Sequence, residues 1–294
     1  MRTANFKSAA IAALLSMGLL TGCTNGITNQ KTSNHMDTLN LTQEWDKKFP
    51  QSNKVNHRKV TFKNRYDITL AADLYEPKNI ESKVPAIAVS GPFGAVKEQS
   101  SGLYAQTMAE CGFLTLAFDP SYTGESGGEP RNVASPDINT EDFSAAVDFL
   151  IAHPNVDAKR IGIIGICGFG GMGLNAAAMD TRIKATVAST MYDMSRVNAN
   201  GYFDAEDSAE VRRNKREAMN AIRTRDAQNG TATPGTPGLP TSIKGDEPQF
   251  VKDYFDYYKT ERAFHARAIN SNGAWNPTMA LSLSLIHISE PTRL

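Results

Sequence analysis

The chain has 294 residues, enough for one large domain or two small ones with a substantial hydrophobic core. It carries 31 basic and 31 acidic residues, so its formal net charge is zero, and no basic block stands out. This balance argues against a nucleic-acid partner and favours a small molecule or a protein as the substrate.

Residues 1–22 have the pattern of a secretory signal peptide. Arg2 and Lys7 precede an apolar run that is too short to span a membrane, and small residues end it. The closing sequence "LTGC" resembles the lipobox of bacterial lipoproteins, with a buried N-terminal helix as the alternative. By that resemblance Cys23 is lipidated and anchors an exported protein at a bacterial membrane, facing the periplasm. Thr24 in the next position favours the outer membrane.

Two other segments are not expected to belong to the folded core. Residues 23–50 are rich in Asn and Thr, which predicts a flexible tether. Residues 281–294 contain "LSLIHISEPTRL", which resembles the translation of a sequencing adapter, with a short terminal strand as the alternative. On the adapter interpretation the native sequence stops near Ala280.

Between these ends, strand-like and helix-like segments alternate, which predicts a mostly parallel sheet with crossover helices in a core of residues 51–194. Residues 57–64 and 68–77 predict an opening antiparallel pair of strands. Three short apolar runs predict buried strands, 84–91, 113–119 and 160–167, and residues 183–190 supply the next strand, which makes four core strands. Three helices are expected between them: 101–111, 140–153 with Thr140 as the N-cap, and 168 to about 179.

The composition and the predicted secondary structure of the sequence change after Tyr192. Residues 204–228 are charged and helical, residues 229–242 form a Pro/Gly/Thr loop, and residues 247–270 predict another helix with many aromatic residues. We expect residues 195–280 to form a helical, cap-like region over a binding site. An ordinary helical surface layer is the alternative.

The stretch "GICGFGG" places Cys167 where a strand turns abruptly into a helix. Such a turn strains the backbone and projects the side chain above the sheet, and glycines such as Gly165 and Gly170 let the strand and helix pass closely. The helix dipole favours the thiolate, which is the nucleophilic form. A phosphate-binding loop is disfavoured because the expected G-x-G-x-x-G register is absent, and a structural cysteine in a tight turn is the other alternative.

Three motifs, in this order, resemble those of α/β-hydrolases: "VSGPFGAVKEQ", "AFDPSYTGESGG" and "GICGFGG". The similarity runs from about residue 58 to 280 and is close to the dienelactone-hydrolase-like branch, which uses a cysteine nucleophile. It implies an α/β-hydrolase fold with a mostly parallel, doubly wound sheet, a helical cap-like insertion and missing C-terminal strands. By this resemblance Cys167 attacks an acyl carbonyl, and the backbone N–H groups of Gly168 and Phe93 form the oxyanion hole. Phe169 departs from the family pattern, which has a small residue there.

The family order places an acid and a histidine after the nucleophile. Asp193 is the candidate acid, with helix capping as its alternative role. His265 is the one histidine after Cys167 outside the adapter-like tail, and a surface or packing role is its alternative. We expect the base histidine to be absent from this chain. Asp119 and Glu125 are expected to be turn or pocket-wall residues.

The resemblance predicts a hydrolase that cleaves an ester, lactone or thioester through a Cys167 acyl-enzyme, in a chain truncated before its acid and histidine and therefore inactive. A non-catalytic, lipid-anchored binding module on the same fold is the alternative, and a peptidase of this fold is a further one. The expected partners are a small-molecule acyl substrate and a membrane. We expect no metal or organic cofactor, because no His or Cys cluster has ligand spacing, and no disulfide between Cys111 and Cys167.

Overall fold

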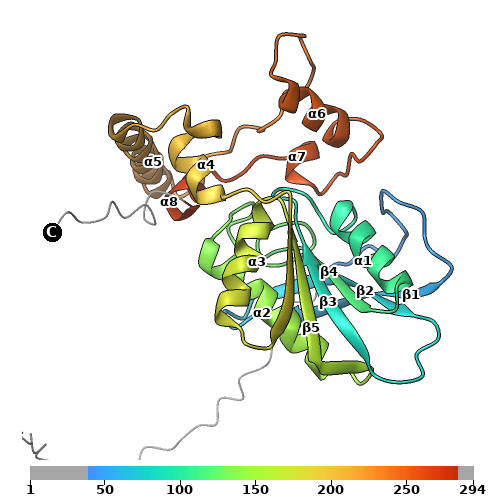
Figure 1. The fold of residues 1–294 in the computed structure, drawn as a ribbon. Helices are drawn as coiled ribbons and strands as arrows, with labels where there is room; N and C mark the ends of the chain where they lie inside the picture. Colours follow the sequence, from blue (N-terminus) through green and yellow to red (C-terminus); the bar gives the residue numbers. More distant parts are fainter. Residues whose placement is uncertain (1–38, 284–294) are drawn as a thin grey trace, which may run out of the picture. The chain divides into compact units, whose positions relative to one another are not determined.

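The computed structural model describes residues 39–283, so the predicted signal peptide, Cys23 and residues 284–294 of the adapter-like tail lie outside the described residues. The described residues contain a six-stranded sheet in the order β1-β2-β4-β3-β5-β6, with helices on both faces (Figure 1). The β1, β2 and β4 strands pair antiparallel, whereas β4, β3, β5 and β6 are parallel neighbours. This arrangement confirms the mostly parallel, doubly wound α/β sheet.

The strands and the helices between them follow the predicted order. The strands are β1 (Val55–Lys63), β2 (Thr69–Pro77), β3 (Val84–Ser90), β4 (Leu114–Phe118), β5 (Val156–Ile166) and β6 (Ile183–Ser189). The helices are α1 (Ser100–Glu110), α2 (Pro136–Ala152) and α3 (Gly168–Met179). The prediction is wrong at the start of α2, where Ser135 rather than Thr140 is the N-cap. Pro136 suits the first helical position because its φ is fixed and the missing N–H would have no partner there.

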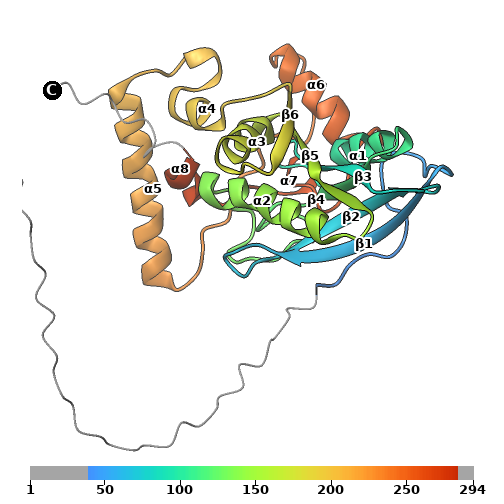
Figure 2. The ribbon, with the colours of Figure 1, turned by 60° about the horizontal axis from the view of Figure 1, so that its bottom comes forward.

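The central strands β3, β4 and β5 lie between helices on both faces of the sheet (Figures 1 and 2), whereas β6 at its edge is largely exposed, with Val187 52% exposed. Helices α2 and α3 cover one face, where Phe143 and Met172 pack with Ile163 of β5. Helix α1 covers the other face, where Ala105 packs with Ile164. Consecutive side chains of a strand point to opposite faces, so a strand covered on both sides must be apolar along its whole length. This explains the uninterrupted apolar runs of the sequence.

Residues 39–50, which the sequence assigns to the flexible tether, pack against the same face as α1. Phe49 is buried, and its ring lies 5.7 Å from that of Trp45. The ammonium of Lys47 lies 3.1 Å from the carboxylate of Asp73, and both side chains are fully buried. The tether prediction is therefore wrong for these residues, because two aromatic rings and a buried ion pair fix them to the sheet.

After β6 the described residues form helices joined by loops, the longest of which spans residues 230–248. Its elements are α4 (Met194–Asn200), η1 (Tyr202–Asp204), α5 (Ala209–Asn229), α6 (Gln249–Tyr258), α7 (Ile269–Asn272), η2 (Pro277–Met279) and α8 (Ala280–Leu283). Figure 1 shows α4, α6 and α7 near the end of the sheet where β5 passes into α3. None of the helices within residues 39–283 is long and apolar enough to cross a bilayer.

The predicted helix over residues 247–270 is shorter than expected. It ends at Tyr258 as α6, and residues 259–268 form turns before α7 begins. These turns bury His265 and half-bury Arg267 beside charged side chains of the core. A continuous helix is disfavoured here because the segment bends to reach those partners.

Candidate active site

Cys167 lies at the junction of β5 and α3, where the sequence places it. Its backbone has φ 57° and ψ −125°, a conformation that L residues rarely adopt and that active-site turns use. The backbone N–H of Cys167 donates to the carbonyl of Ser189 at 2.9 Å, and its carbonyl accepts from Gly170 N–H at 2.9 Å. The strained turn is therefore held from both sides, by β6 and by the first turn of α3.

The strand and the helix approach each other closely at this turn. A Cβ atom at Gly165 would lie 2.3 Å from the carbonyl oxygen of Phe169, so only glycine fits that position without movement. Phe169 itself is buried, with its ring 6.4 Å from Phe143 and 6.3 Å from Phe93. A Cβ at Gly91 would lie 2.9 Å from the Phe169 Cβ. The bulky residue at this unusual position is thus accommodated by a glycine in the loop after β3.

The backbone N–H groups of Gly168 and Phe93 both act on the Cys167 thiol. Burial raises the pKa of the thiol, and hydrogen bonding from these two N–H groups acts in the opposite direction without overcoming it. The predicted preference for the thiolate is therefore wrong in direction, because removal from water disfavours the charged form. The two N–H groups come from the loop after β3 and from the first residue of α3, and both favour negative charge at this position.

The half-buried thiol opens into a cavity of about 590 Å³. The loop after β3 contributes Phe93, and the segment after β6 contributes Tyr192 and Met194. The rest of the wall comes mainly from residues after α4, including Tyr254 of α6 and Asn270 of α7. The region predicted to be cap-like therefore forms much of the wall around Cys167.

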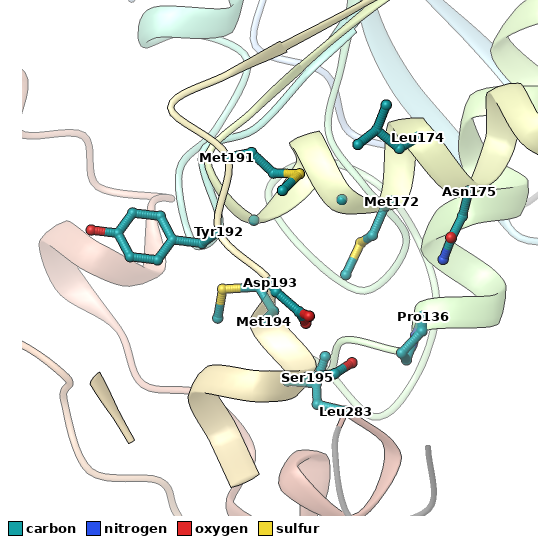
Figure 3. A pocket seen from close by; sticks show the side chains of 12 residues that line it. Pro136, Met172, Leu174, Asn175, Met191, Tyr192, Asp193, Met194, Ser195 and Leu283 are labelled. Carbon is teal, nitrogen blue, oxygen red and sulfur yellow. The ribbon is translucent and has the colours of Figure 1, made fainter. Parts of the chain in front are cut away.

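Asp193, the candidate acid, is the N-cap of α4. Its carboxylate accepts the backbone N–H of Arg196 at 3.0 Å. It faces a second cavity of about 330 Å³, shown in Figure 3. Tyr192 and Met194 line both cavities. No hydrogen bond or ion pair within residues 39–283 joins Asp193 to a histidine, so these contacts support the capping role that the sequence left open.

His265 does not line the Cys167 cavity. Its Nε2 atom lies 3.5 Å from a carboxylate oxygen of Asp46, and its Nδ1 accepts the backbone N–H of Arg267 at 3.3 Å. Burial lowers the pKa of its imidazole. The structure thus brings His265 to a charged cluster and not to Cys167, in agreement with a packing role.

That charged cluster joins the two loops predicted from motifs. The Lys97 ammonium lies 2.7 Å from Glu98, 2.9 Å from Asp119 and 2.6 Å from Glu125, and all four residues are buried. The Asp119 carboxylate also accepts the backbone N–H groups of Lys97 and Glu125, at 2.8 and 2.9 Å. Asp119 and Glu125 lie in the turn after β4, as predicted, but they pair with Lys97 and do not line the Cys167 cavity. The sequence prediction did not identify Lys97 and Glu98, although both belong to the motif "VSGPFGAVKEQ".

No metal site is found among residues 39–283, since no group of three or more His, Cys, Asp or Glu side chains there is arranged to hold an ion. Cys111 and Cys167 are both free thiols.

Comparison with known proteins gives the family. Residues 67–282 match the family model described as X-Pro dipeptidyl-peptidase (S15 family). The chain belongs to the S15 family. Relatives and solved structures agree on the fold of this S15-family chain, which is an α/β-hydrolase. The narrower similarity to dienelactone hydrolases stays a prediction.

Three similar proteins illustrate this. The uncharacterised protein PA2218 of Pseudomonas aeruginosa is 58% identical over 287 residues, which cover 96% of this chain and 76% of the relative. Its crystal structure has a TM-score of 0.81 at 62% identity and covers 85% and 77% of the two chains. The α/β hydrolase GrgF of Penicillium sp. sh18 has a TM-score of 0.58 at 23% identity, over 76% and 74%. The thiohydrolase aneE of Aspergillus aculeatus is 34% identical over 108 residues, 37% of this chain and 34% of that protein.

Proposed function

We propose that this S15-family chain cleaves an ester, lactone or thioester through a covalent acyl intermediate on Cys167. The observation that carries the proposal is the position of the thiol: it lies on a strained turn between β5 and α3 and lines a cavity, with the backbone N–H groups of Gly168 and Phe93 favouring negative charge there. The similarity to a fungal protein named a thiohydrolase supports a thioester among the three substrate types.

The acyl transfer can be written from these groups. The thiolate of Cys167 attacks the carbonyl carbon and forms a C–S bond, and the carbonyl electron pair moves to oxygen, where the N–H groups of Gly168 and Phe93 stabilise it. Collapse of this intermediate breaks the bond to the leaving alkoxide or thiolate, which takes up a proton. Water then attacks the acyl-enzyme, releasing the acid and the free thiol.

The thiol must first lose its proton, which makes this step slow. No histidine or carboxylate lines the Cys167 cavity within residues 39–283. We therefore assign the proton to solvent, and we expect slow, pH-dependent acylation from this chain. Slow acylation is thus the expected consequence of the predicted lack of a base histidine.

Cleavage of a peptide bond is the second candidate, and the S15 family match favours it. A peptide would acylate Cys167 by the same attack. Its amine leaving group, however, must be protonated as it departs, which calls for an acid beside the scissile bond. Esters and thioesters are favoured because their leaving groups depart more readily without one.

Acylating and alkylating reagents separate a catalytic Cys167 from an ordinary thiol. A phenyl thioester develops an oxyanion when it is attacked, whereas iodoacetamide does not. We expect the thioester to modify Cys167 in preference to the exposed Cys111, and iodoacetamide to favour Cys111. Intact mass and peptide mapping measure both ratios, with Cys167→Ala and Cys111→Ala as controls. Equal acylation of the two thiols would overturn the proposal and support a non-catalytic binding module.

We further propose that Cys23 is lipidated and holds the protein at a bacterial membrane, facing the periplasm. The sequence "LTGC" supports this proposal. Metabolic labelling with a clickable palmitate in a bacterial host tests it. We expect the Cys23→Ser variant to lose the label and the Cys111→Ser variant to keep it. Labelling that does not depend on Cys23 would contradict the lipidation proposal.

A further inference from the structure

The cavity at Cys167 is electrically neutral. No Asp, Glu, Lys, Arg or His is found among the described residues that line it. Its polar groups are hydroxyls and amides, such as those of Thr190 and Asn270. Burial raises the pKa of Tyr202, Tyr254 and Tyr258, so their hydroxyls stay protonated at neutral pH. A ligand in this cavity therefore meets dipoles but no opposite charge.

Aromatic rings form much of the cavity wall. Six of the lining residues are aromatic: Phe93, Tyr192, Tyr202, Tyr254, Tyr258 and Trp275. The rings of Phe93 and Trp275 stack with centroids 4.3 Å apart, and Tyr192 meets Tyr202 edge to face at 6.1 Å. Aromatic rings bind one another by offset stacking and by edge-to-face contact, which adds to the benefit of apolar burial. The walls are thus suited to a flat, aromatic ligand.

The position of this wall relative to the thiol identifies which part of a substrate it would hold. Phe93 contributes its backbone N–H to Cys167 and its ring to the wall. A carbonyl held at the thiol would therefore place one of its two substituents against the stacked rings, and once the leaving group has departed only the acyl group remains bonded at the thiol. The volume of about 590 Å³ lies within the range of small-molecule pockets, about 300–1,000 Å³.

A charged acyl group would be disfavoured here. A carboxylate that enters the cavity loses water and finds no counter-ion, and burial of an unpaired ion is strongly unfavourable. An ammonium group also loses water, although ring faces attract cations. A cationic acyl group is therefore the main competing outcome.

We propose that the acyl part of the substrate is an uncharged aromatic group held by this ring-lined cavity. The inference rests on the proposed function of Cys167 and adds the substrate class to it. It also separates this substrate from a dipeptide with a protonated amino terminus, for which the cavity offers no carboxylate.

Binding can be measured without chemistry. Cys167→Ala is titrated by calorimetry with four unreactive N-methylamides: 2-naphthoyl, decahydronaphthoyl, 6-carboxy-2-naphthoyl and 6-trimethylammonio-2-naphthoyl. We expect the naphthoyl amide to bind about 5-fold more tightly than its saturated counterpart. We expect it to bind on the order of 100-fold more tightly than the carboxylate. Equal affinities, or preference for either ion, would overturn the proposal.

Variants of the wall provide matched controls. Tyr202 is 40% exposed and lines the cavity, whereas Tyr104 is 39% exposed on α1 and does not line it. Tyr202→Ala should weaken naphthoyl binding about 5-fold and Tyr104→Ala should leave it unchanged. Val197→Lys places an ammonium in the wall and should raise affinity for the carboxylate by about 10-fold or more. An unchanged carboxylate affinity in a folded Val197→Lys would refute the neutral-wall argument.

Acylation of the unsubstituted protein distinguishes the proposed aromatic binding site from the proposed acyl-enzyme function of Cys167. The four acyl groups are offered as phenyl thioesters, and modification of Cys167 is followed by mass. Selective binding without acylation would support the ring-lined site and overturn the acyl-enzyme. Acylation without preference among the four thioesters would support the acyl-enzyme and overturn the aromatic binding site.

Discussion

The side-chain amide of Asn270 donates a hydrogen bond to the carbonyl oxygen of Phe93 at 2.8 Å. The backbone N–H of Asn270 donates to the carbonyl of Gly94 at 3.0 Å, and a Cβ at Gly94 would lie 2.4 Å from the Asn270 amide oxygen. Gly94 also has φ +81°, which favours glycine. Asn270 of α7 thus forms hydrogen bonds with two consecutive peptide units of the loop after β3. The proposed oxyanion donor, Phe93 N–H, lies on that loop.

Asn270→Ala should therefore slow acylation more than it weakens binding. The substitution removes the side-chain hydrogen bond to the Phe93 carbonyl, so the Phe93 N–H is less well positioned toward the oxyanion. We therefore expect the maximal rate of Cys167 acylation to fall roughly 10–100-fold. The thioester concentration at half-maximal rate should change little. Asn198→Ala is the control, because Asn198 lines the same cavity but donates to the Met194 carbonyl at 2.8 Å. A rise in half-maximal concentration with an unchanged maximal rate would assign Asn270 to binding alone.

Two glycines near Cys167 should respond differently to alanine. Gly165→Ala forces a Cβ to within 2.3 Å of the Phe169 carbonyl oxygen, so β5 and α3 must separate, at a cost of about 1–3 kcal/mol in the free energy of unfolding. At Gly171 the nearest atom would be 3.5 Å away, an ordinary contact, and alanine favours the helix by up to about 1 kcal/mol. Urea denaturation of both variants measures the difference. Equal stabilities would argue against the tight turn.

The succession of strands along the chain and the place of Cys167 could be predicted because both depend on local sequence patterns. Apolar runs identified β3 to β6, and the glycines around Cys167 adjoin it in sequence. The contacts that shape the site join distant segments: Asn270 reaches Phe93 across 177 positions, and Gln99 reaches the Ala263 carbonyl across 164. Hydrophobic periodicity identifies local elements and does not reveal which distant residues meet, so the ring-lined cavity could not be predicted.

The charged cluster escaped prediction for a different reason. Lysine and glutamate side by side usually face water, and the sequence around Lys97 and Glu98 does not show that both are buried. Besides Lys97, the buried Glu98 is paired with Arg267 at 2.9 Å and with Lys59 of β1 at 3.1 Å. Such a cluster is recognisable only when four separate segments have been brought together.

Lys97→Met should destabilise the protein, and more at neutral than at acid pH. The substitution leaves the carboxylates of Glu98, Asp119 and Glu125 without the central ammonium, and removing one partner of a buried ion pair costs about 3–5 kcal/mol. Urea denaturation at pH 7.5 measures the loss. Lys63→Met is the control, because Lys63 pairs with Asp67 at an exposed site, where a pair contributes at most about 1 kcal/mol.

The pH dependence of that loss has a definite sign. Although burial acts to raise it, the Lys97 ammonium helps to hold the pKa of Glu125 at about 2, and the pKa of Glu98 lies well below its usual range. The stability linked to these two lowered pKa values is present above about pH 4.5 and is lost as pH falls towards 2. In Lys97→Met the carboxyl groups are free to take up protons on acidification, so the difference from the parent should shrink at pH 5. A difference that grows on acidification would contradict the cluster's role.

The rate of Cys167 acylation should rise steeply with pH. Burial raises the pKa of this thiol, against the N–H groups of Gly168 and Phe93, so little thiolate is present at neutral pH. Below the pKa, a rate proportional to thiolate increases about tenfold per pH unit. The measurement is the single-turnover rate of acylation by a phenyl thioester from pH 6 to 10 in Cys111→Ser, which removes the exposed thiol. We expect the rise to continue past the ordinary range of a cysteine. A profile that levels off near pH 7 would show instead that a base already pairs with Cys167, and the assignment of its proton to solvent would be wrong.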